Sequence, residues 1–382
     1  MTDNRNFHFF NHHSVDASDW PFYEELRRLI GEDHAVVLSE SVILQYSRRW
    51  KLVLIGWPLL IWSTFRLAIK SARQRQKADF LVVEEHFQLW SLSLVYFLLR
   101  LFGRTGRPVF VYLGFIYTPR ESKLLSTLRR AYFAVALRMT DVVVVYSELE
   151  MMKLGATFSA CRNKFRFVHL GIGEHESIRA HTQRIRENGI RGNGIRGNGQ
   201  TLKRNSQSLI FSAGRSSRDY SVLAKAVDLL RPKLRCVVVC DSYEECPSSL
   251  ESESFVVLRD CYGNSYTQQL VSSDLVVIPL RNPEISAGQM VAIHALAAGK
   301  PLIISDTPIT REYFQECYGV GIIRTDCPVT LAKEIEKVVE ASVRLDGEFE
   351  MIRHAFESKF SVQCYANRLY RVLSREFLIS EK

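Results

Sequence analysis

The sequence predicts an α/β fold built from two doubly wound domains. Short apolar runs alternate with segments of helical periodicity, which is typical of a parallel sheet covered by helices on both faces. This alternation occurs twice, on either side of a Gly- and Asn-rich stretch at 187–200 in which NGIRG is repeated. A chain of 382 residues, 47% of them hydrophobic, is long enough to form two such cores.

Eleven apolar runs are expected to form the strands of the two sheets. In the first half they lie at 7–13, 34–40, 78–85, 107–114, 141–147 and 164–171. In the second half they lie at 208–214, 235–240, 254–259, 274–280 and 301–305. Helices between them, joined by right-handed crossovers, would wind each series into a single sheet.

These patterns divide the chain into four segments. We expect an N-terminal domain at 1–176, a flexible linker at 177–207, a second domain at 208–360 and a C-terminal helix at 361–382. Gly and Asn at the density found in the repeat bury little apolar surface, which favours a linker over a phosphate-binding loop.

The cysteine spacing and the N-terminal sequence indicate the cellular compartment of the protein. The eight cysteines lack paired CxxC spacing, and the first fourteen residues lack the basic and apolar regions of a secretory signal. We therefore expect reduced thiols, no metal site and a cytoplasmic location.

Positive charge is concentrated at 48–77, where eight Lys and Arg residues occur without an acidic one. The apolar run 52–62 within this segment is shorter than the roughly 20 residues that span a bilayer. We expect the segment to lie on an anionic membrane surface, where each cation adds about 1 kcal/mol. The alternative is a buried helix with a solvated basic end. No nucleic-acid-binding signature occurs, so nucleic acid is not an expected partner.

A possible anion site begins at Ser286. The sequence Ser-Ala-Gly-Gln opens a helix after the run 274–280, and the unpaired N–H groups of a helix start favour a phosphate. Gly288 would let the anion approach, while Ser286 and Gln289 supply a hydroxyl and an amide. The alternative is a helix in which Ser286 is only the N-cap.

The second half resembles the retaining-type GT-B glycosyltransferases of glycosyltransferase family 4. The similar stretches are FSAGRSSRDYSVLAKAVDLL (211–230), SSDLVVIPL (272–280) and SAGQMVAIHALAAGKPLIISDTP (286–308). A weaker likeness runs through DVVVVYSELE and KFRFVHLGIG in the first half. The resemblance implies the GT-B fold, in which two Rossmann-like domains face an interdomain cleft. It also implies that the helix at 361–382 crosses back to the first domain, and that a nucleoside diphosphate sugar is the donor substrate, without a cofactor or bound metal.

The resemblance further implies a set of donor-binding residues. They are Gly214, Arg215, Arg218, Leu258, Arg259, Ser286, Ala287, Gly288, Gln289 and His294. Arg215 or Arg218 would neutralise the diphosphate, because cleavage of the glycosidic bond leaves negative charge there. Gly288 and Gln289 would hold the same group by backbone amides, and the segment 257–260 would contact the base.

The sequence departs from the family where two glutamates often stand eight positions apart. This chain has Ser286 and His294 at those positions. A histidine can still form a hydrogen bond with a ribose hydroxyl, and Glu284 could substitute from nearby. The donor sugar and the retaining or inverting course therefore stay open.

The first half should supply any general base. The candidates are His12 and His13 after the first strand, and Glu84, Glu85 and His86 after the third. Strand carboxyl ends form the ligand-binding edge of doubly wound sheets, and a base with a pKa near neutrality suits proton removal from an acceptor hydroxyl. The alternatives are a helix cap at 11–14 and a structural pair at 85–86.

These inferences together predict a glycosyltransferase. It would move a sugar from a nucleoside diphosphate sugar to a glycolipid, other lipid-linked acceptor or polysaccharide at the cytoplasmic membrane face. One alternative is a sugar-nucleotide epimerase of the same fold, which would need additional cleft carboxylates and no membrane surface. Another is a non-catalytic binding paralogue, suggested by Ser286 and His294.

Overall fold

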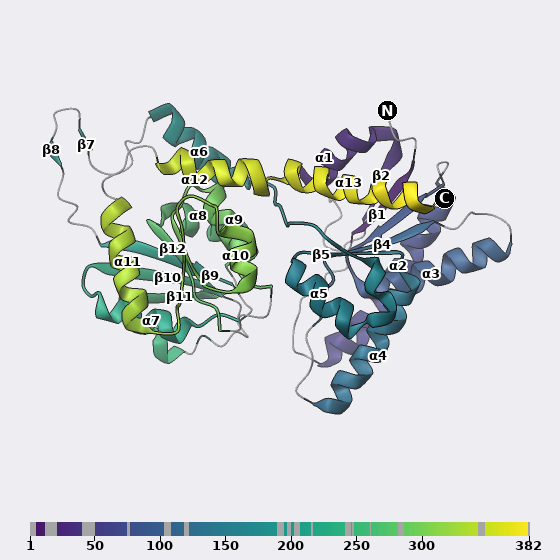
Figure 1. The fold of residues 1–382 in the computed structure, drawn as a ribbon, viewed down its shortest axis with the longest axis horizontal. Helices are drawn as coiled ribbons and strands as arrows, with labels where there is room; N and C mark the ends of the chain where they lie inside the picture. Colours follow the sequence, from purple (N-terminus) through teal and green to yellow (C-terminus); the bar gives the residue numbers. More distant parts are fainter. Residues whose placement is uncertain are drawn as a thin grey trace. The chain divides into compact units, whose positions relative to one another are not determined.

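The computed structural model describes most of the chain. The described residues are 5–11, 21–39, 50–74, 77–102, 108–117, 122–188, 195–196, 200–201, 207–214, 217–240, 246, 248–259, 261–281, 286–342 and 348–380. The chain divides into two compact units, coloured along the sequence in Figure 1. Unit 1 comprises residues 1–169 and 365–382, and unit 2 comprises residues 170–364.

Unit 1 contains a six-stranded parallel sheet in the order β2-β1-β3-β4-β5-β6. Its strands are β1 (Phe7–Asn11), β2 (Ala35–Ser39), β3 (Phe80–Val83), β4 (Val109–Leu113), β5 (Val142–Val145) and β6 (Phe165–Phe167). Its α-helices are α1 (Pro21–Ile30), α2 (Trp50–Arg73), α3 (His86–Leu101), α4 (Lys123–Met139) and α5 (Glu148–Thr157), with most of α13 (Val362–Ser380) added from the C-terminus.

Strand side chains in unit 1 alternate between two apolar clusters, one on each face of the sheet. Phe10 and Val83 belong to the cluster that includes residues of α3 and α4. Phe9 and Val82 belong to the cluster that includes residues of α1 and α13. The C-terminal helix thus supplies part of one core of unit 1, because Leu369 and other α13 side chains are buried there.

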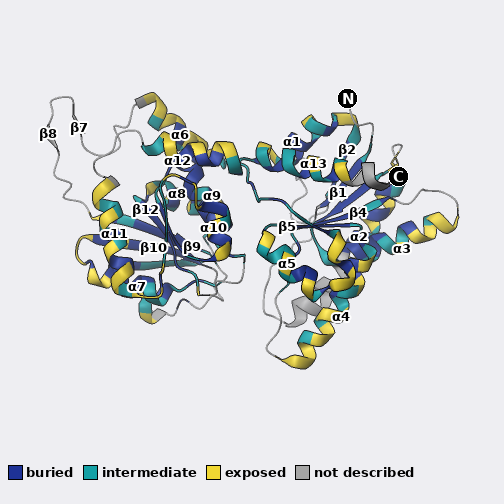
Figure 2. Cartoon of the chain, in the orientation of Figure 1, coloured by how far each residue is buried: buried dark blue, intermediate teal, exposed yellow. Residues whose placement is uncertain are grey.

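Unit 2 contains a second six-stranded parallel sheet, in the order β11-β10-β9-β12-β13-β14. Its strands are β9 (Ser208–Ala213), β10 (Leu234–Cys240), β11 (Phe255–Arg259), β12 (Leu275–Ile278), β13 (Leu302–Ser305) and β14 (Val320–Ile323). Its α-helices are α6 (Glu176–Asn188), α7 (Tyr220–Leu229), α8 (Gly263–Ser272), α9 (Gln289–Ala297), α10 (Pro308–Phe314), α11 (Pro328–Ser342) and α12 (Glu348–Ala355). Figure 2 shows most strands of both units in the colour of buried residues, whereas the edge strands β11 and β14 are mostly intermediate. The two parallel sheets confirm the predicted α/β fold with two doubly wound domains.

Two elements differ from the sequence expectation. The segment 177–207, expected to be a linker, begins with most of helix α6, followed by a short antiparallel pair, β7 (Ile195–Arg196) with β8 (Gln200–Thr201). Helix α6 forms because Ile178 and Thr182 are buried and Thr182 Oγ1 accepts a hydrogen bond from Arg353 Nη1 at 2.8 Å. Strand β14 was not predicted, because its four residues, VGII, include a glycine and form only a short apolar run.

None of the helices within the described part of the chain has the length and apolar character that crossing a bilayer requires. Helix α2, which contains most of the basic segment 48–77, buries Leu67 and Ala68 and exposes Trp62 and Lys70. This helix is therefore partly a core element of unit 1.

Candidate functional site

The strand order of unit 2 reverses between β9 and β12. The chain places β10 and β11 on one side of β9, and then β12, β13 and β14 on the other. Ligands of doubly wound sheets bind outside the strand carboxyl ends at such a point. The residues that follow Ala213 and Ile278 are therefore candidate ligand-binding residues.

A buried guanidinium group lies at the carboxyl end of β9. Arg218 is 6% exposed, and its Nε donates to Ala213 O at 2.9 Å. Gly214 has φ 122°, and a Cβ atom at this position would overlap the Arg218 guanidinium. Glycine is required here because it tolerates this backbone conformation and leaves space for the cation.

The segments that follow β9 and β12 pair with each other. Asp219 N donates to Pro279 O at 2.9 Å, and Arg281 N donates to Ser217 O at 2.9 Å. Asp219 also caps helix α7, since its Oδ1 accepts from Val222 N at 3.2 Å. These bonds fix the backbone on both sides of Arg218.

Helix α9 starts beside the same edge of the sheet. Gly288 is its N-cap residue with φ 88°, and a Cβ atom there would lie 3.1 Å from Ile278 Cγ2. The buried Gln289 donates from Nε2 to Ser286 Oγ at 2.9 Å, and Ala287 is buried. The first-turn N–H groups of a helix have no intrahelical acceptors, so this end of α9 suits an anion.

His294 lies further along α9, next to Tyr266 of α8. The Tyr266 hydroxyl is 3.3 Å from His294 Nδ1, and the Tyr266 ring packs edge-on against Phe211 of β9 at 5.5 Å between centroids. Burial, with a further contribution from His175, lowers the pKa of His294 to about 4. The imidazole is therefore neutral at pH 7 and can form hydrogen bonds with a hydroxyl group.

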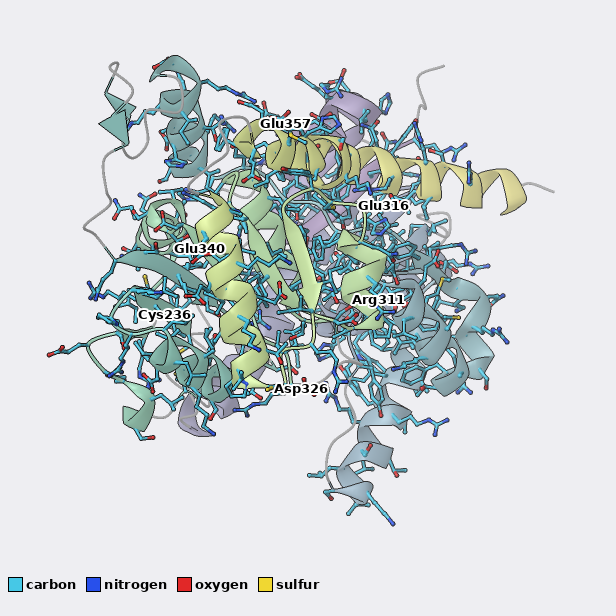
Figure 3. The ribbon with its side chains drawn as sticks, turned by 60° about the vertical axis from the view of Figure 1, so that its left-hand side comes forward. Cys236, Arg311, Glu316, Asp326, Glu340 and Glu357 are labelled. Atoms are coloured by element: carbon cyan, nitrogen blue, oxygen red, sulfur yellow. The ribbon has the colours of Figure 1, made fainter. Side chains whose placement is uncertain are left out.

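The carboxyl ends of β13 and β11 border this region. Ser305 Oγ accepts from Leu280 N at 2.6 Å, which ties β13 to the segment after β12. Asp306 then forms a bidentate pair with Arg311 of α10, at 2.5 and 2.6 Å; Arg311 is labelled in Figure 3. On β11, Leu258 is half-buried, and Arg259 Nη2 donates to Cys246 O at 2.8 Å.

In unit 1 the strand order reverses between β1 and β3, and a buried amide joins the ends of these strands. Gln88 of α3 donates from Nε2 to Phe10 O at 3.3 Å. Its Oε1 accepts from Glu84 N at 3.2 Å and from Glu85 N at 3.1 Å. Gln88 therefore positions the two carboxylates at the switch point of this sheet.

The environment of these carboxylates favours their protonated forms. Burial and repulsion from Glu85 raise the pKa of Glu84 to about 7, although a hydrogen bond from Tyr23 lowers it by a smaller amount. The Tyr23 hydroxyl is 3.5 Å from Glu84 Oε1. Burial also raises the pKa of Glu85. A carboxylate with a pKa near 7 can accept a proton at neutral pH and is suited to general-base chemistry.

His86 follows directly and starts α3. Its ring packs edge-on against Tyr132 and Phe133 of α4, at 5.6 and 5.3 Å between centroids. Burial, with a smaller effect of Arg129, lowers the pKa of His86. His86 is therefore a neutral aromatic contact at pH 7, which makes Glu84 the more suitable base.

Comparison with known proteins indicates which reaction class this site belongs to. Residues 207–341 match the family model described as "Glycosyl transferases group 1". This match covers β9 to α11, including Arg218, Gly288 and His294. Comparison with curated protein sequences gives no match.

Solved structures of similar fold cover almost the whole chain. A glycosyltransferase from Rickettsia africae has a TM-score of 0.63 and 14% identity, over 97% of this chain and 98% of that one. The sucrose-phosphate synthase of Thermosynechococcus elongatus has a TM-score of 0.64 and 13% identity, over 98% and 100%. HepE of Anabaena in complex with UDP has a TM-score of 0.63 and 12% identity, over 97% and 100%. The chain has the GT-B fold, and its residues 207–341 form a group 1 glycosyltransferase domain. This identification confirms the predicted fold and enzyme class.

The glycosyltransferase brings several predicted donor residues to one sheet edge. Gly214, Arg218, Gly288 and Gln289 follow β9 or β12, and His294 lies in the helix that begins there. Arg215, His12, His13 and Glu284 lie outside the described residues. In unit 1, Glu85 and His86 follow β3.

Two positioning residues of the glycosyltransferase were not recognised in the sequence. Gln88 stands three residues after Glu85, which is the spacing of a capping box, and both hydrogen bonds of that box are present. Tyr266 has no comparable signal, because its contact with His294 depends on the packing of α8 against α9 and β9.

Proposed function

We propose that this glycosyltransferase transfers a sugar from a nucleoside diphosphate sugar to a lipid-linked or polysaccharide acceptor at the cytoplasmic face of a membrane. The observation that supports the donor site is that a buried Arg218 follows β9 and the N-terminus of α9 follows the neighbouring strand β12, at the switch point of the sheet. A diphosphate needs such a combination of a cation and backbone N–H donors.

Uridine diphosphate is the first nucleotide to test. Structures of Anabaena HepE, which has a similar fold, contain UDP, UDP with glucose, or UDP-glucose. In this chain, the diphosphate would lie between Arg218 and the first turn of α9. His294, held by Tyr266, would then form a hydrogen bond with a ribose hydroxyl, while Leu258 and Arg259 border the base.

Glu84 is the proposed general base for the acceptor hydroxyl. Its raised pKa and its position after β3 support this role, and Gln88 fixes the backbone that carries it. Glu85 and His86 would line the same acceptor site. The basic segment 48–77 would contact the anionic membrane surface, because Arg66 and Lys70 are exposed beside Trp62 and Ile69.

Thermal shift and transfer assays with UDP-, GDP-, TDP- and ADP-sugars test the donor half. Ligand at a hundred times its dissociation constant should stabilise the protein by about 2.7 kcal/mol. Gly288→Trp should abolish the shift, because a Cβ atom there already lies 3.1 Å from Ile278 Cγ2 and a larger side chain would displace the first turn of α9. Gly263→Ala is the control, since a Cβ atom there meets no neighbour within 4 Å. Absence of a shift with every nucleotide would reject the proposed donor site.

A further inference from the structure

The first two turns of helix α4 expose apolar side chains to an unusual extent. Leu124, Leu125 and Leu128 are 69%, 57% and 58% exposed. Figure 2 shows this end of α4 almost entirely in the colour of exposed residues. Ile116 in the segment before the helix is exposed as well. Contiguous exposed apolar side chains of this kind mark interaction surfaces.

The charge on this helix identifies the kind of surface that it fits. Residues 122–140 contain no Asp or Glu, whereas Lys123, Arg130 and Arg138 are exposed. Leucines interspersed with cations complement an anionic lipid headgroup layer, in which the leucines reach the acyl boundary and the cations meet phosphates. An apolar groove of a protein partner could bury the leucines, but it would not explain why all the charged residues on this helix are positive.

Aromatic contacts hold the exposed turns in place. The Tyr117 hydroxyl donates to Ser126 O at 3.5 Å, and the Tyr117 ring packs against Phe133 and Phe158 at 5.9 and 5.2 Å. Phe133 also contacts His86, which follows Glu85 at the end of β3. A chain of contacts within unit 1 thus connects the exposed turns of α4 to the candidate acceptor residues.

We propose that the first two turns of α4, residues Lys123–Arg130, form a docking surface for an anionic lipid bilayer. This inference deepens the proposed function, because it assigns a surface that would hold the acceptor residues of unit 1 near the headgroups. The leucines enter the headgroup region, and Lys123 and Arg130 contact lipid phosphates.

Vesicle flotation of the full-length protein tests this surface. Wild-type protein should bind vesicles of phosphatidylcholine and phosphatidylglycerol and should float poorly with phosphatidylcholine alone. The triple variant Leu124→Ser, Leu125→Ser, Leu128→Ser should bind at least about tenfold more weakly. The matched control is Leu229→Ser, Val329→Ser, Met351→Ser, which changes three exposed apolar side chains of unit 2 and should bind like wild type.

The proposal is overturned if the α4 triple variant binds anionic vesicles as tightly as wild type, or if wild type does not bind them. Equal binding to neutral and anionic vesicles would also overturn it, because the cations would then contribute nothing. A thermal shift with UDP on the same variants separates this result from the donor assignment. A normal UDP shift without vesicle binding rejects the docking surface and the membrane contact of segment 48–77, but it leaves the donor site in place. Vesicle binding without any nucleotide shift rejects only the donor site.

Discussion

The hydroxyl of Tyr266 lies 3.3 Å from Nδ1 of His294 and joins helix α8 to helix α9 at the candidate donor site. The two rings also contact each other, at 5.6 Å between centroids. This contact restricts the imidazole orientation, so that Nε2 is the nitrogen left for a ligand hydroxyl. His294 is neutral at pH 7 because burial lowers its pKa to about 4.

Tyr266→Phe should weaken donor binding about five- to tenfold, which corresponds to the loss of one positioning hydrogen bond. The ring contact with Phe211 would be retained, so the melting temperature should change little. Tyr318→Phe is a suitable control, because it also removes a hydroxyl hydrogen bond, to Glu348 at 3.0 Å. Calorimetric titration with UDP measures the effect. Equal affinities of wild type and Tyr266→Phe would show that His294 needs no such support.

The lowered pKa of His294 predicts that acid destabilises the protein. The unfolded chain takes up a proton near pH 6.5, whereas the folded chain does so only near pH 4. The neutral ring therefore contributes full stability above pH 6.5, and this contribution is lost as the pH falls toward 4. Between pH 8 and pH 5 the loss from this group is about 2 kcal/mol. Urea unfolding of wild type and His294→Gln should reveal a smaller pH dependence in the variant. If the unfolding free energies of the two proteins change equally with pH, the lowered pKa of His294 is contradicted.

Glu84→Gln should remove transfer activity and increase stability at pH 8. Loss of a general base lowers the turnover rate about 10²- to 10⁴-fold. The carboxylate is destabilised in the folded state, because its pKa is raised to about 7. It contributes full stability below pH 4.5, and that contribution is lost as the pH rises through 7. A neutral glutamine avoids this loss, which is worth on the order of 1–3 kcal/mol at pH 8.

The pH dependence of transfer gives a second readout for Glu84. Wild-type activity should rise with pH through about 7, as the carboxylate becomes ionised. Tyr23→Phe removes a hydrogen bond that lowers the pKa of Glu84, so the rise should move to higher pH. Glu32→Gln serves as a control, because Glu32 is exposed. If the Glu84→Gln variant keeps wild-type turnover, Glu84 is not the general base and another residue must be.

The fold was predictable from sequence because its main signal is local. Apolar runs such as VVVV at 142–145 and LIIS at 302–305 are bounded by polar residues and read directly as buried strands. Helix α6 was not predicted, because its mean composition is polar and only Ile178 and Thr182 reveal its buried side. The local sequence does not show which distant helix packs against Ile178 and Thr182.

The candidate site was predictable only in part, for the same physical reason. Glycines with positive φ, such as Gly214 and Gly288, are visible as glycines at the ends of apolar runs. The pKa of Glu84 depends on burial and on Glu85 together with Tyr23, which is 61 residues away along the chain. Long-range contacts of this kind leave no periodic pattern in the sequence.

Gly214→Ala should reduce donor affinity more than it reduces stability. Alanine at φ 122° strains the backbone, and its methyl group would displace the Arg218 guanidinium from Ala213 O. Removing a charged hydrogen-bond donor from a diphosphate site costs about 1.5–3 kcal/mol, or roughly 10- to 150-fold in the dissociation constant. Gly263→Ala also introduces a side chain at positive φ, 57°, but into open space. The comparison therefore separates backbone strain from loss of the cation. Equal UDP affinity in the two variants would exclude Arg218 from the diphosphate site, whereas selective loss in Gly214→Ala would support it.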